Sequence, residues 1–353
     1  GFDQIISCYT RPTSPLPSQI DPFLCTHLMI IGSTSVNDNG SPNMPNEEQL
    51  MAITELKLKN KDLKVFLTLT PSNPVMSDLT LDEHLMSLFV ANVTAYLLKN
   101  NVDGFDLDWE FPVWSPDAKP TDKEGMNRLV QAFRKAFDAA PRPLGLSLAV
   151  SGPFTITSIA YDLSTINKYA DFVQIMNYDY HDWAIDTPFC GFNAPLYAAT
   201  DLILMRDFNS NFSTQFFLNN GLSKEKCVFG IPTYARGYEL LVELDHDPFA
   251  IAVGPSKLFG DDLTYNKVCK VLQSADFTAT WDEKAQSPYF YGKKQWVSYE
   301  DVRSVSAKAK YAKDSGLRGI MIFDLPTDDF TGICGLGTDY PLIRAAKKAF
   351  LGV

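Results

Sequence analysis

The sequence lacks the features that would place it in a membrane or in a fibre. No apolar run reaches the roughly 18 residues that a membrane-spanning helix needs, and no segment repeats with a period of about 20 to 50 residues. There is no low-complexity tract and no long block of like charges. We therefore expect neither a membrane partner nor a repeat architecture, and long disordered segments are disfavoured.

Several catalytic and binding signatures are missing as well. There is no CxxC pair for zinc or redox chemistry, no Walker sequence, no HExxH and no GxSxG. Lysine and arginine number 31 against 42 aspartates and glutamates, which gives a net charge of −11 and an isoelectric point near 4.9. Binding to nucleic acid would then need a local basic patch. We expect no metal, no cofactor and no nucleic-acid partner, and a neutral or cationic ligand.

The residues that are present fit a globular protein with a large core. Hydrophobic residues make up 45% of the 353 residues, and charged residues make up 21%. This length allows two domains of about 150 residues, or one eight-fold α/β barrel of about 250 residues with an insertion. Aromatic residues account for 12% of the chain, so some of them are candidates for platforms beneath a ligand.

Three observations suggest an oxidising, secretory setting. The six cysteines allow 15 pairings among Cys8, Cys25, Cys190, Cys227, Cys269 and Cys334. Asn-x-Ser/Thr sequons begin at Asn39, Asn92 and Asn211. The chain opens with Gly1 rather than Met, as a mature product does once its signal peptide is removed. We expect a secreted, extracellular glycoprotein that is monomeric.

Short β-rich runs alternate with helical periodicity along most of the chain, which predicts parallel βα units. Eight such runs close into an α/β fold of the (β/α)8 TIM-barrel type. The predicted strands are Gln4 to Tyr9, Thr26 to Ile31, Lys64 to Leu69, Gly104 to Asp108, Leu144 to Val150, Phe172 to Tyr178, Cys227 to Tyr234 and Gly319 to Phe323. Helices are predicted over Asn46 to Lys59, Leu81 to Lys99, Asp122 to Asp138 and Tyr299 to Asp314.

The alternation breaks from about Gly237 to Gln295. This segment is rich in aromatic residues and reads as short antiparallel strands around a helix near Asn266 to Gln273. We predict a small α+β subdomain over residues 237–295, inserted into a barrel that is built from residues 1–236 and 296–353.

The most informative segment is the acidic run Asp103-Gly104-Phe105-Asp106-Leu107-Asp108-Trp109-Glu110. In a strand, alternate residues share a face, so Asp106, Asp108 and Glu110 would point together into the barrel toward its C-terminal mouth. Carboxyl groups at this spacing cannot all ionise cheaply, so at least one should have a raised pKa. Glu110, which lies nearest the mouth, is the natural proton donor to a leaving group, and Asp108 can orient a reacting group beside it.

Two other interpretations of this run remain open. It could be a solvated acidic strand end, although Phe105, Leu107 and Trp109 interleave the acids. It could also bind Mg²⁺ or Ca²⁺, because hard cations take oxygen ligands. The residues alone do not name the substrate.

The run DGFDLDWE, followed by Phe111-Pro112, resembles the DxxDxDxE signature of glycoside hydrolase family 18, the chitinases and chitinase-like lectins. The resemblance extends over nearly the whole chain. The further segments that resemble family motifs are Cys25-Thr26-His27-Leu28, Gln174-Ile175-Met176-Asn177-Tyr178-Asp179-Tyr180-His181, Gly230-Ile231-Pro232-Thr233-Tyr234-Ala235-Arg236, Gly319-Ile320-Met321-Ile322, Asp328-Asp329-Phe330 and Cys334-Gly335.

This resemblance implies hydrolysis of β-1,4-linked N-acetylglucosamine with retention of configuration, the N-acetyl carbonyl of the substrate serving as nucleophile. Glu110 would protonate the glycosidic oxygen. Asp108 would hold the acetamide N–H and stabilise the oxazolinium ion, while Asp106 shares protons behind it and Asp103 gives structural support. Tyr178 would hydrogen-bond the acetamide carbonyl.

The resemblance also implies substrate contacts outside the acidic run. Asp179 and Tyr234 would line the same subsite as Tyr178, and Arg236 would contact sugar hydroxyls or support the insertion. Trp114, which follows Glu110, and Trp183, which follows the sixth strand, are candidate rim platforms; Tyr9 on the first strand is a further candidate contact. Trp281 and Trp296 are expected to pack within or beside the insertion.

The chain departs from the family pattern around the sugar-binding mouth. Phe323 stands where active members usually have a Trp at the end of the eighth strand, so the floor beneath the sugar is smaller and lacks an N–H. The third strand runs on into Thr70-Pro71-Ser72-Asn73 instead of a Gly-Gly turn followed by Trp. The second strand ends without the aromatic that is often found there.

The resemblance implies disulfide bonds between Cys8 and Cys25 and between Cys269 and Cys334. This leaves Cys190 and Cys227 as a hypothetical third pair.

We therefore expect a secreted chitinase-type hydrolase that acts on chitin or on N-acetylglucosamine oligosaccharides. The retained Glu110 favours this function. The alternative is a chitinase-like lectin that binds such sugars with little or no turnover, favoured by Phe323 and the altered third strand. A third class is a secreted factor that uses the barrel only as a scaffold.

Overall fold

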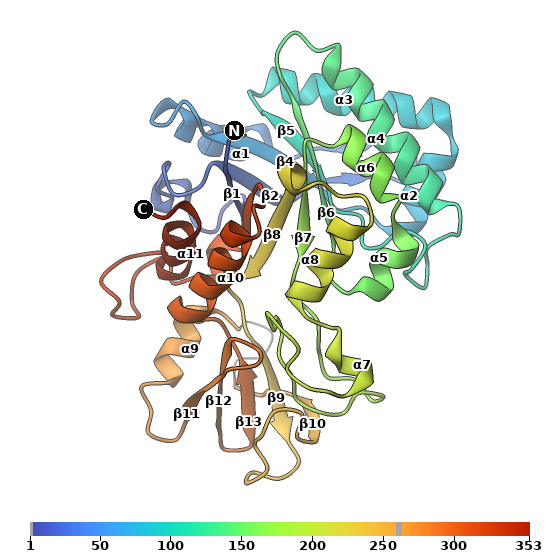
Figure 1. Cartoon of the computed structure of the whole chain (residues 1–353). Helices are drawn as coiled ribbons and strands as arrows, with labels where there is room; N and C mark the ends of the chain where they lie inside the picture. Colours follow the sequence, from blue (N-terminus) through green and yellow to red (C-terminus); the bar gives the residue numbers. More distant parts are fainter. Residues whose placement is uncertain (1–2, 259–262) are drawn as a thin grey trace. The chain divides into compact units, whose positions relative to one another are not determined.

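Apolar strands that alternate with helices build a closed barrel. The computed structural model of the chain describes residues 3–258 and 263–353 (Figure 1). Within these residues, eight strands pair in the order β1-β14-β8-β7-β6-β5-β4-β2, and β2 pairs again with β1 to close the ring. The strands are β1 (Ile5–Thr10), β2 (His27–Val36), β4 (Lys64–Leu69), β5 (Gly104–Leu107), β6 (Gly145–Ser151), β7 (Phe172–Met176), β8 (Cys227–Pro232) and β14 (Gly319–Phe323). The predicted (β/α)8 TIM barrel is confirmed.

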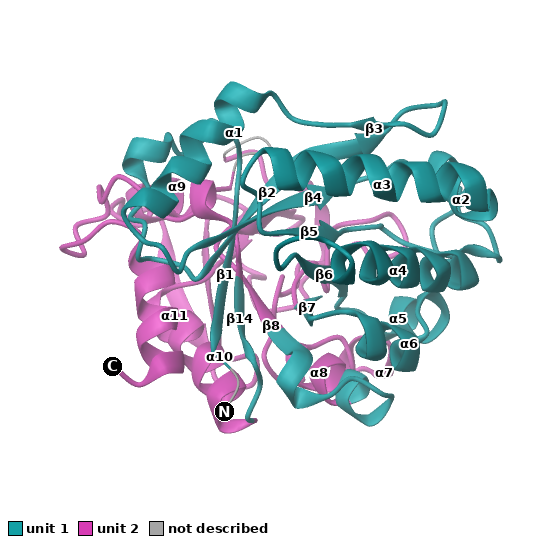
Figure 2. Cartoon of the chain, turned by 90° about the horizontal axis from the view of Figure 1, so that it is seen from above, with its two compact units in different colours: residues 1–175, 216–228, 316–321 teal, residues 176–215, 229–315, 322–353 magenta. Residues whose placement is uncertain are grey.

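The chain divides into two compact units (Figure 2). Unit 1 comprises residues 1–175, 216–228 and 316–321, and unit 2 comprises residues 176–215, 229–315 and 322–353. All eight barrel strands have residues in unit 1. Strands β7, β8 and β14 begin in unit 1 and end in unit 2, so the acidic run belongs to unit 1 and the residues that follow these three strands belong to unit 2.

Helices connect the strands of unit 1. They are α1 (Glu47–Thr54), η2 (Glu55–Leu58), α2 (Asn73–Leu81), α3 (Glu83–Lys99), α4 (Asp122–Asp138), α5 (Phe154–Ala160) and α6 (Leu163–Tyr169). The short helix η1 (Pro17–Gln19) lies in a loop, η3 (Lys224–Lys226) precedes β8, and the short strand β3 (Pro42–Asn43) pairs antiparallel with the end of β2. Helix α4 matches its predicted range. The predicted Leu81 to Lys99 helix is preceded by α2, because the Asp82 side chain accepts from the backbone N–H groups of His84 and Leu85 and starts a new helix there.

Aromatic rings fill the amino-terminal end of the barrel in unit 1. The Phe66 ring lies over Gly104 and Gly145, where an added Cβ would come within 2.4 Å and 2.6 Å of its Cζ atom. The rings of His27 and Phe172 contact Phe66 at centroid distances of 5.4 Å and 5.8 Å. Burial lowers the pKa of His27 to about 3, so its imidazole is neutral at physiological pH. This end of the barrel is a packed core.

Unit 2 contains a five-stranded antiparallel sheet in the order β10-β9-β13-β12-β11. Its strands are β9 (Arg236–Leu240), β10 (Ala252–Pro255), β11 (Thr278–Asp282), β12 (Ser287–Gly292) and β13 (Gln295–Ser298), and α9 (Tyr265–Val271) lies between β10 and β11 in the sequence. Trp296, Tyr238 and Tyr289 form a buried cluster on one face of this sheet. Residues 259–262 of the predicted insertion lie outside the described residues.

The remaining elements of unit 2 are α7 (Ile203–Arg206), α10 (Val302–Asp314), η4 (Leu325–Thr327) and α11 (Pro341–Leu351), while α8 (Ser210–Asn219) spans both units. Helix α10 starts after Asp301, whose side chain and Ser304 form a capping box. The predicted helix therefore begins three residues too early at Tyr299. Among the described residues, no helix combines the length and the apolar composition needed to cross a bilayer.

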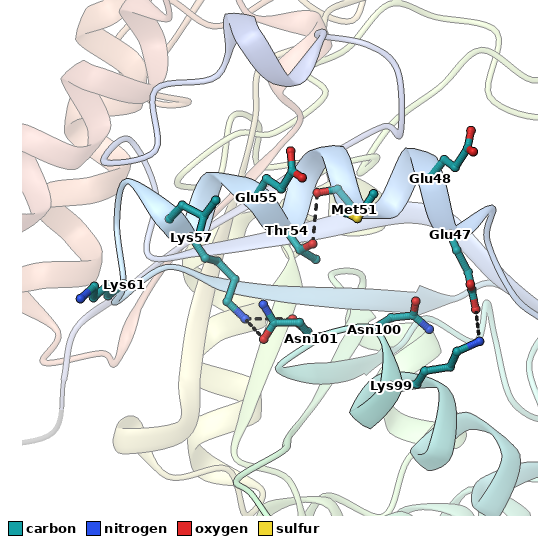
Figure 3. A pocket seen from close by; sticks show the side chains of 11 residues that line it. Glu47, Glu48, Met51, Thr54, Glu55, Lys57, Lys61, Lys99, Asn100 and Asn101 are labelled. Atoms are coloured by element: carbon teal, nitrogen blue, oxygen red, sulfur yellow. Dashed lines mark hydrogen bonds and ion pairs between the residues drawn. The ribbon is translucent and has the colours of Figure 1, made fainter.

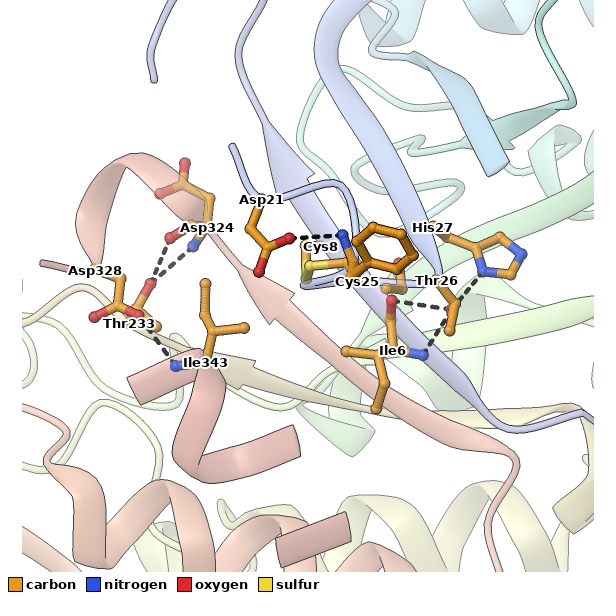
Figure 4. The surroundings of a disulfide bond; sticks show 12 residues. Ile6, Cys8, Asp21, Cys25, Thr26, His27, Thr233, Asp324, Asp328 and Ile343 are labelled. Atoms are coloured by element: carbon orange, nitrogen blue, oxygen red, sulfur yellow. Dashed lines mark hydrogen bonds between the residues drawn. A yellow bond between two sulfur atoms is a disulfide. The ribbon is translucent and has the colours of Figure 1, made fainter. Parts of the chain in front are cut away.

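Two disulfide bonds form and one predicted pair does not. Cys8 bonds Cys25 beside β1 and β2 in unit 1 (Figure 4), and Cys269 bonds Cys334 in unit 2. Cys190 and Cys227 are buried free thiols, so the hypothetical third pair is wrong. The two thiols lie in different parts of the fold. Cys190 packs in the aromatic cluster of unit 2, with Sγ 3.6 Å from the Asp247 carbonyl oxygen. Cys227 is the first residue of β8, in unit 1.

The buried carboxyl of Asp328 caps helix α11 and makes stability sensitive to pH. It accepts from the backbone N–H groups of Ile343 at 3.0 Å and of Asp329 at 2.7 Å, yet burial raises its pKa to about 7. The folded state holds the Asp328 proton more tightly than the unfolded state does. The stabilisation that this protonated carboxyl adds to the free energy of unfolding is therefore fully present below a pH of about 4. The contribution is lost as the pH rises through about 7.

We therefore expect the free energy of unfolding of the native chain, measured relative to Asp328→Asn, to fall between pH 4 and pH 8. The fall is at most about 4 kcal/mol, since a shift of one pKa unit corresponds to about 1.4 kcal/mol. Urea unfolding of both proteins across this range checks the result. A difference between the two proteins that is independent of pH would contradict it.

Candidate active site

Asp106 lies at the centre of a buried hydrogen-bond network in unit 1. Its Oδ1 atom accepts from Ser147 Oγ at 2.7 Å and from Gln174 Nε2 at 3.2 Å, and its Oδ2 atom accepts from Tyr9 OH at 2.5 Å. Gln174 Nε2 also donates to Tyr9 OH at 2.9 Å. Burial raises the pKa of Asp106, while these donors favour its charged form. The network fixes the carboxyl in a single orientation.

Asp108 follows the end of β5 and has the opposite environment. Its Oδ1 atom is buried and has no hydrogen-bond partner among the residues that the structure describes. Burial raises the pKa of Asp108 well above the usual range, and the negative charges of Glu110 and Asp106 raise it further. Burying a carboxyl oxygen without a hydrogen-bond donor destabilises the folded chain. A ligand that donates a hydrogen bond to Asp108 Oδ1 would remove this penalty.

Glu110 is the exposed end of the acidic row. Trp109 before it is almost fully buried at 1% exposure and anchors the backbone there. Tyr161 lies close enough for the charges of Asp108 and Glu110 to act on it; burial, and then these charges, raise the pKa of its hydroxyl. Along the row, Asp106 is buried and hydrogen-bonded at both oxygens, whereas Glu110 is exposed to solvent.

Asp103 stands apart from this row. Its carboxylate pairs with Lys57 Nζ at 2.9 Å and accepts from the Val65 backbone N–H at 2.9 Å. Lys57 also donates to the Asn101 carbonyl oxygen at 2.9 Å, at the edge of a surface groove of about 650 Å³ between α1, η2 and the end of α3 (Figure 3). None of the predicted site residues, Asp103 included, is among the residues that line this groove. Asp103 therefore ties β4 and β5 to the outer helices.

In unit 2, three aromatic rings gather at the carboxyl ends of β7, β8 and β14. The Tyr178 ring lies 5.9 Å from the rings of Tyr234 and Phe323, and the Tyr234 and Phe323 rings are 6.1 Å apart between centroids. Tyr178 is 5% exposed, whereas Tyr234 and Phe323 are half-buried. The half-buried pair presents an apolar surface of the kind on which a sugar ring can stack.

Charged groups border these rings. Arg236 Nη2 pairs with Asp179 Oδ1 at 2.6 Å, and Tyr234 OH donates to the same oxygen. Burial disfavours the charge on Arg236, but the Asp179 carboxylate raises its pKa overall. Asp179 has a left-handed backbone with φ of 60°, and its N–H donates to Asn193 Oδ1 at 3.0 Å.

The predicted tryptophans occupy different surroundings. Trp114 is 45% exposed and lies edge-on to Phe111 at 6.1 Å. Trp183 packs against the aromatic cluster of unit 2 and donates from Nε1 to the Ala252 carbonyl oxygen at 2.8 Å. Trp296 is buried and donates to the His246 carbonyl oxygen, and the Arg303 guanidinium lies 3.9 Å above the Trp281 ring.

Sequence reasoning missed several residues that arrange the site. Ser147, Gln174 and Thr68 surround Asp106, and Asn193 orients Asp179. Ser147 and Gln174 could have been found, because each is a polar residue in the middle of a buried, otherwise apolar strand. Asn193 lies in a loop and gives no such signal.

No group of three or more His, Cys, Asp or Glu side chains suited to a metal ion is found in residues 3–258 and 263–353. The innermost carboxyl group, that of Asp106, instead accepts hydrogen bonds from Tyr9, Ser147 and Gln174. Carboxyl groups of graded burial along one barrel segment are typical of a site of the glycoside-hydrolase class.

Comparison with known proteins gives the family. The model of glycosyl hydrolases family 18 matches residues 5–328. Chitotriosidase-1 of Mus musculus is 32% identical over 349 residues, which cover 94% of this chain and 73% of that protein. The chain therefore belongs to glycosyl hydrolases family 18, as the DGFDLDWE run indicates.

Solved structures of both kinds of family member are similar to the chain. The structure of Ostrinia furnacalis Group IV chitinase in complex with allosamidin has a TM-score of 0.92 and 30% identity, and covers 99% of each chain. Human YKL-39, described as a pseudo-chitinase with retained chitooligosaccharide binding, has a TM-score of 0.90 and 26% identity over 99% of this chain and 100% of that one. The chain is a chitinase or a chitinase-like protein.

Proposed function

We propose that the chain is a chitinase-type hydrolase that cleaves β-1,4-linked N-acetylglucosamine with retention of configuration. The observation that carries this proposal is the contrast between two adjacent carboxyl groups. Asp106 is held by donors from other strands, whereas Asp108 has a buried oxygen without a donor and a raised pKa. The N–H of a substrate acetamide supplies the donor that this oxygen lacks.

The proposed reaction uses the acidic row from its outer to its inner end. Glu110 protonates the glycosidic oxygen while the acetamide carbonyl oxygen attacks the anomeric carbon, which gives an oxazolinium ion and releases the leaving sugar. Asp108 accepts the acetamide N–H and stabilises the positive charge of this ion. Glu110 then takes a proton from the water that opens the oxazolinium ring. Asp106 is proposed to share protons with Asp108 from the inner end of the row.

The residues of unit 2 are proposed to bind the sugar. Tyr178 donates to the acetamide carbonyl oxygen, and Tyr234, with Asp179, lines the same subsite. Phe323 forms the floor, Arg236 fixes Asp179 through the ion pair at 2.6 Å, and Trp114 and Trp183 are rim platforms. The Tyr9 hydroxyl donates to Asp106, so we propose that Tyr9 acts by positioning that carboxyl rather than by touching the substrate.

A product time course with defined N-acetylglucosamine oligomers tests the function. We expect shorter oligomers to accumulate with the β anomer formed first. Absence of cleavage across a broad pH range, with oligomer binding intact, would favour the alternative function, a chitinase-like lectin.

The lectin alternative has a specific observation in its favour, which is the smaller floor at Phe323. This ring is half-buried and contacts Tyr178 and Tyr234 at about 6 Å between centroids. A floor that is too small lets the sugar shift, and a displacement near 1 Å costs about a hundredfold in rate.

We therefore expect Phe323→Trp to raise kcat/KM on chitin oligomers by about tenfold, because the larger ring restores apolar area and an N–H donor. Steady-state kinetics on a short oligomer measures the change. Phe192→Trp, which alters a buried ring elsewhere in unit 2, is the control for nonspecific effects of an added indole. Unchanged or lower activity of Phe323→Trp would count against an impaired floor.

We also propose a secreted glycoprotein whose barrel, residues 1–236 and 296–353, carries the 237–295 subdomain. Two disulfide bonds support an oxidising setting. Asn39 and Asn92 are exposed and open to glycan attachment, whereas Asn211 is half-buried and accepts from Tyr311 OH at 2.6 Å.

A further inference from the structure

The side chain of Asn73, four residues after the end of β4, holds the main chain of Glu110. Asn73 Nδ2 donates to the Glu110 carbonyl oxygen at 3.1 Å and to Asp117 Oδ1 at 2.9 Å. Asn73 Oδ1 accepts from the Trp109 indole N–H at 2.9 Å. Because the indole nitrogen can only donate, these contacts fix the orientation of the amide. One side chain thus bonds both the residue before the acid and the acid itself.

Helix α2 gives Asn73 a firm base. Asn73 is the first residue of this helix. Met76 and Leu79 are buried and anchor the helix within unit 1. One turn further on, Ser77 Oγ donates to Asp122 Oδ1 at 2.6 Å. The other oxygen of Asp122 accepts from the backbone N–H groups of Val113 at 3.2 Å and Lys119 at 2.9 Å. The loop that follows Glu110 is therefore fastened at both ends to α2 and α4.

We propose that Asn73 is a positioning residue that sets the direction of the Glu110 side chain through the Glu110 carbonyl. The proposal rests on the proposed function of Glu110 as proton donor. The side chain of Glu110 leaves the same Cα to which this carbonyl is attached, so rotation of the released peptide moves the carboxyl group. The Thr70-Pro71-Ser72-Asn73 segment, which departs from the family pattern, then has a role in catalysis.

Two substitutions separate positioning from simple structural support. Asn73→Asp keeps an acceptor for the Trp109 indole but replaces the donor by an oxygen that repels the Glu110 carbonyl and the Asp117 carboxylate. Asn73→Ala removes all three bonds. Asn127→Ala is the matched control, because Asn127 is a half-buried asparagine on α4 whose Nδ2 donates to Asp162 Oδ2 at 3.1 Å.

We expect both Asn73 variants to lower kcat on an N-acetylglucosamine oligomer by about 10- to 100-fold with KM changed less than about threefold. Asn127→Ala should keep the native kcat. Native kcat in Asn73→Asp would overturn the proposal, and so would an equal loss in Asn127→Ala. If the native chain itself gives no turnover, the proposed function fails.

A crystal structure of Asn73→Asp decides the positioning in that case, because it does not depend on turnover. We expect the Glu110 carbonyl to turn away from residue 73 and the Glu110 carboxyl to move by about 1 Å or more relative to Asp108. An unchanged Glu110 conformation would overturn the proposal whether or not the chain is an enzyme.

Discussion

Replacing Glu110 by glutamine is expected to lower turnover of N-acetylglucosamine oligomers by about a thousandfold or more. The amide keeps the size and the exposed position of the side chain but cannot donate the proton that the leaving oxygen needs, and general acid catalysis contributes about 10²- to 10⁴-fold. Product time courses measured by chromatography give the rate, and calorimetric titration with the same oligomer should show binding within a few-fold of the native chain.

Glu124→Gln provides the matched control, because Glu124 is an exposed glutamate of unit 1 on α4. It should behave like the native chain. Hydrolysis by Glu110→Gln at more than a tenth of the native rate would remove Glu110 from the role of proton donor. Loss of binding in the same variant would instead show that the substitution disturbs the site.

Asp108→Asn is expected to lower kcat by about 10²- to 10³-fold, the range found when one group that stabilises developing charge is removed. The amide oxygen can still accept a hydrogen bond, but the negative charge opposite the oxazolinium ion is gone. Burial and the neighbouring carboxyl groups raise the pKa of Asp108, so the native rate should decline as the pH falls through that raised pKa.

The pH profile distinguishes this role from a general weakening of the fold. Asp108→Asn should lose the acid limb that Asp108 causes and remain slow at every pH. Asp138→Asn, on the exposed face of α4, is the control and should keep the native profile. An Asp108→Asn variant with the native acid limb would assign that limb to another group.

The barrel could be predicted from the sequence because each strand is a short apolar run between polar helices. The alternation of acids along the predicted strand pointed to the acidic row, although β5 ends at Leu107 and Asp108 and Glu110 follow it. The orientation of its members was not, because the difference between Asp106 and Asp108 depends on donors from Tyr9, Ser147 and Gln174. Strand periodicity does not show which residues of distant strands meet.

Helix starts and cysteine pairing show the same limit. Asp82 ends one helix and caps the next, which a continuous hydrophobic period conceals. The pairing of Cys190 with Cys227 was what remained once the family resemblance had assigned the other four cysteines. Elimination carries no information about where a thiol lies, and both are buried free thiols. Asn73 was visible only as a departure from the family pattern, because its partners lie 36 and 37 positions further along the chain.

The network around Asp106 draws on four strands, β1, β4, β6 and β7, and its members Tyr9 and Gln174 are 165 positions apart. A nascent chain that has emerged only as far as β6 still lacks Gln174, and a fragment cut before β7 lacks it permanently. In neither of these shorter chains would Asp106 receive the hydrogen bond that Gln174 donates in the complete barrel. The fully hydrogen-bonded state of Asp106 would then form late in folding, after β7 has joined the barrel.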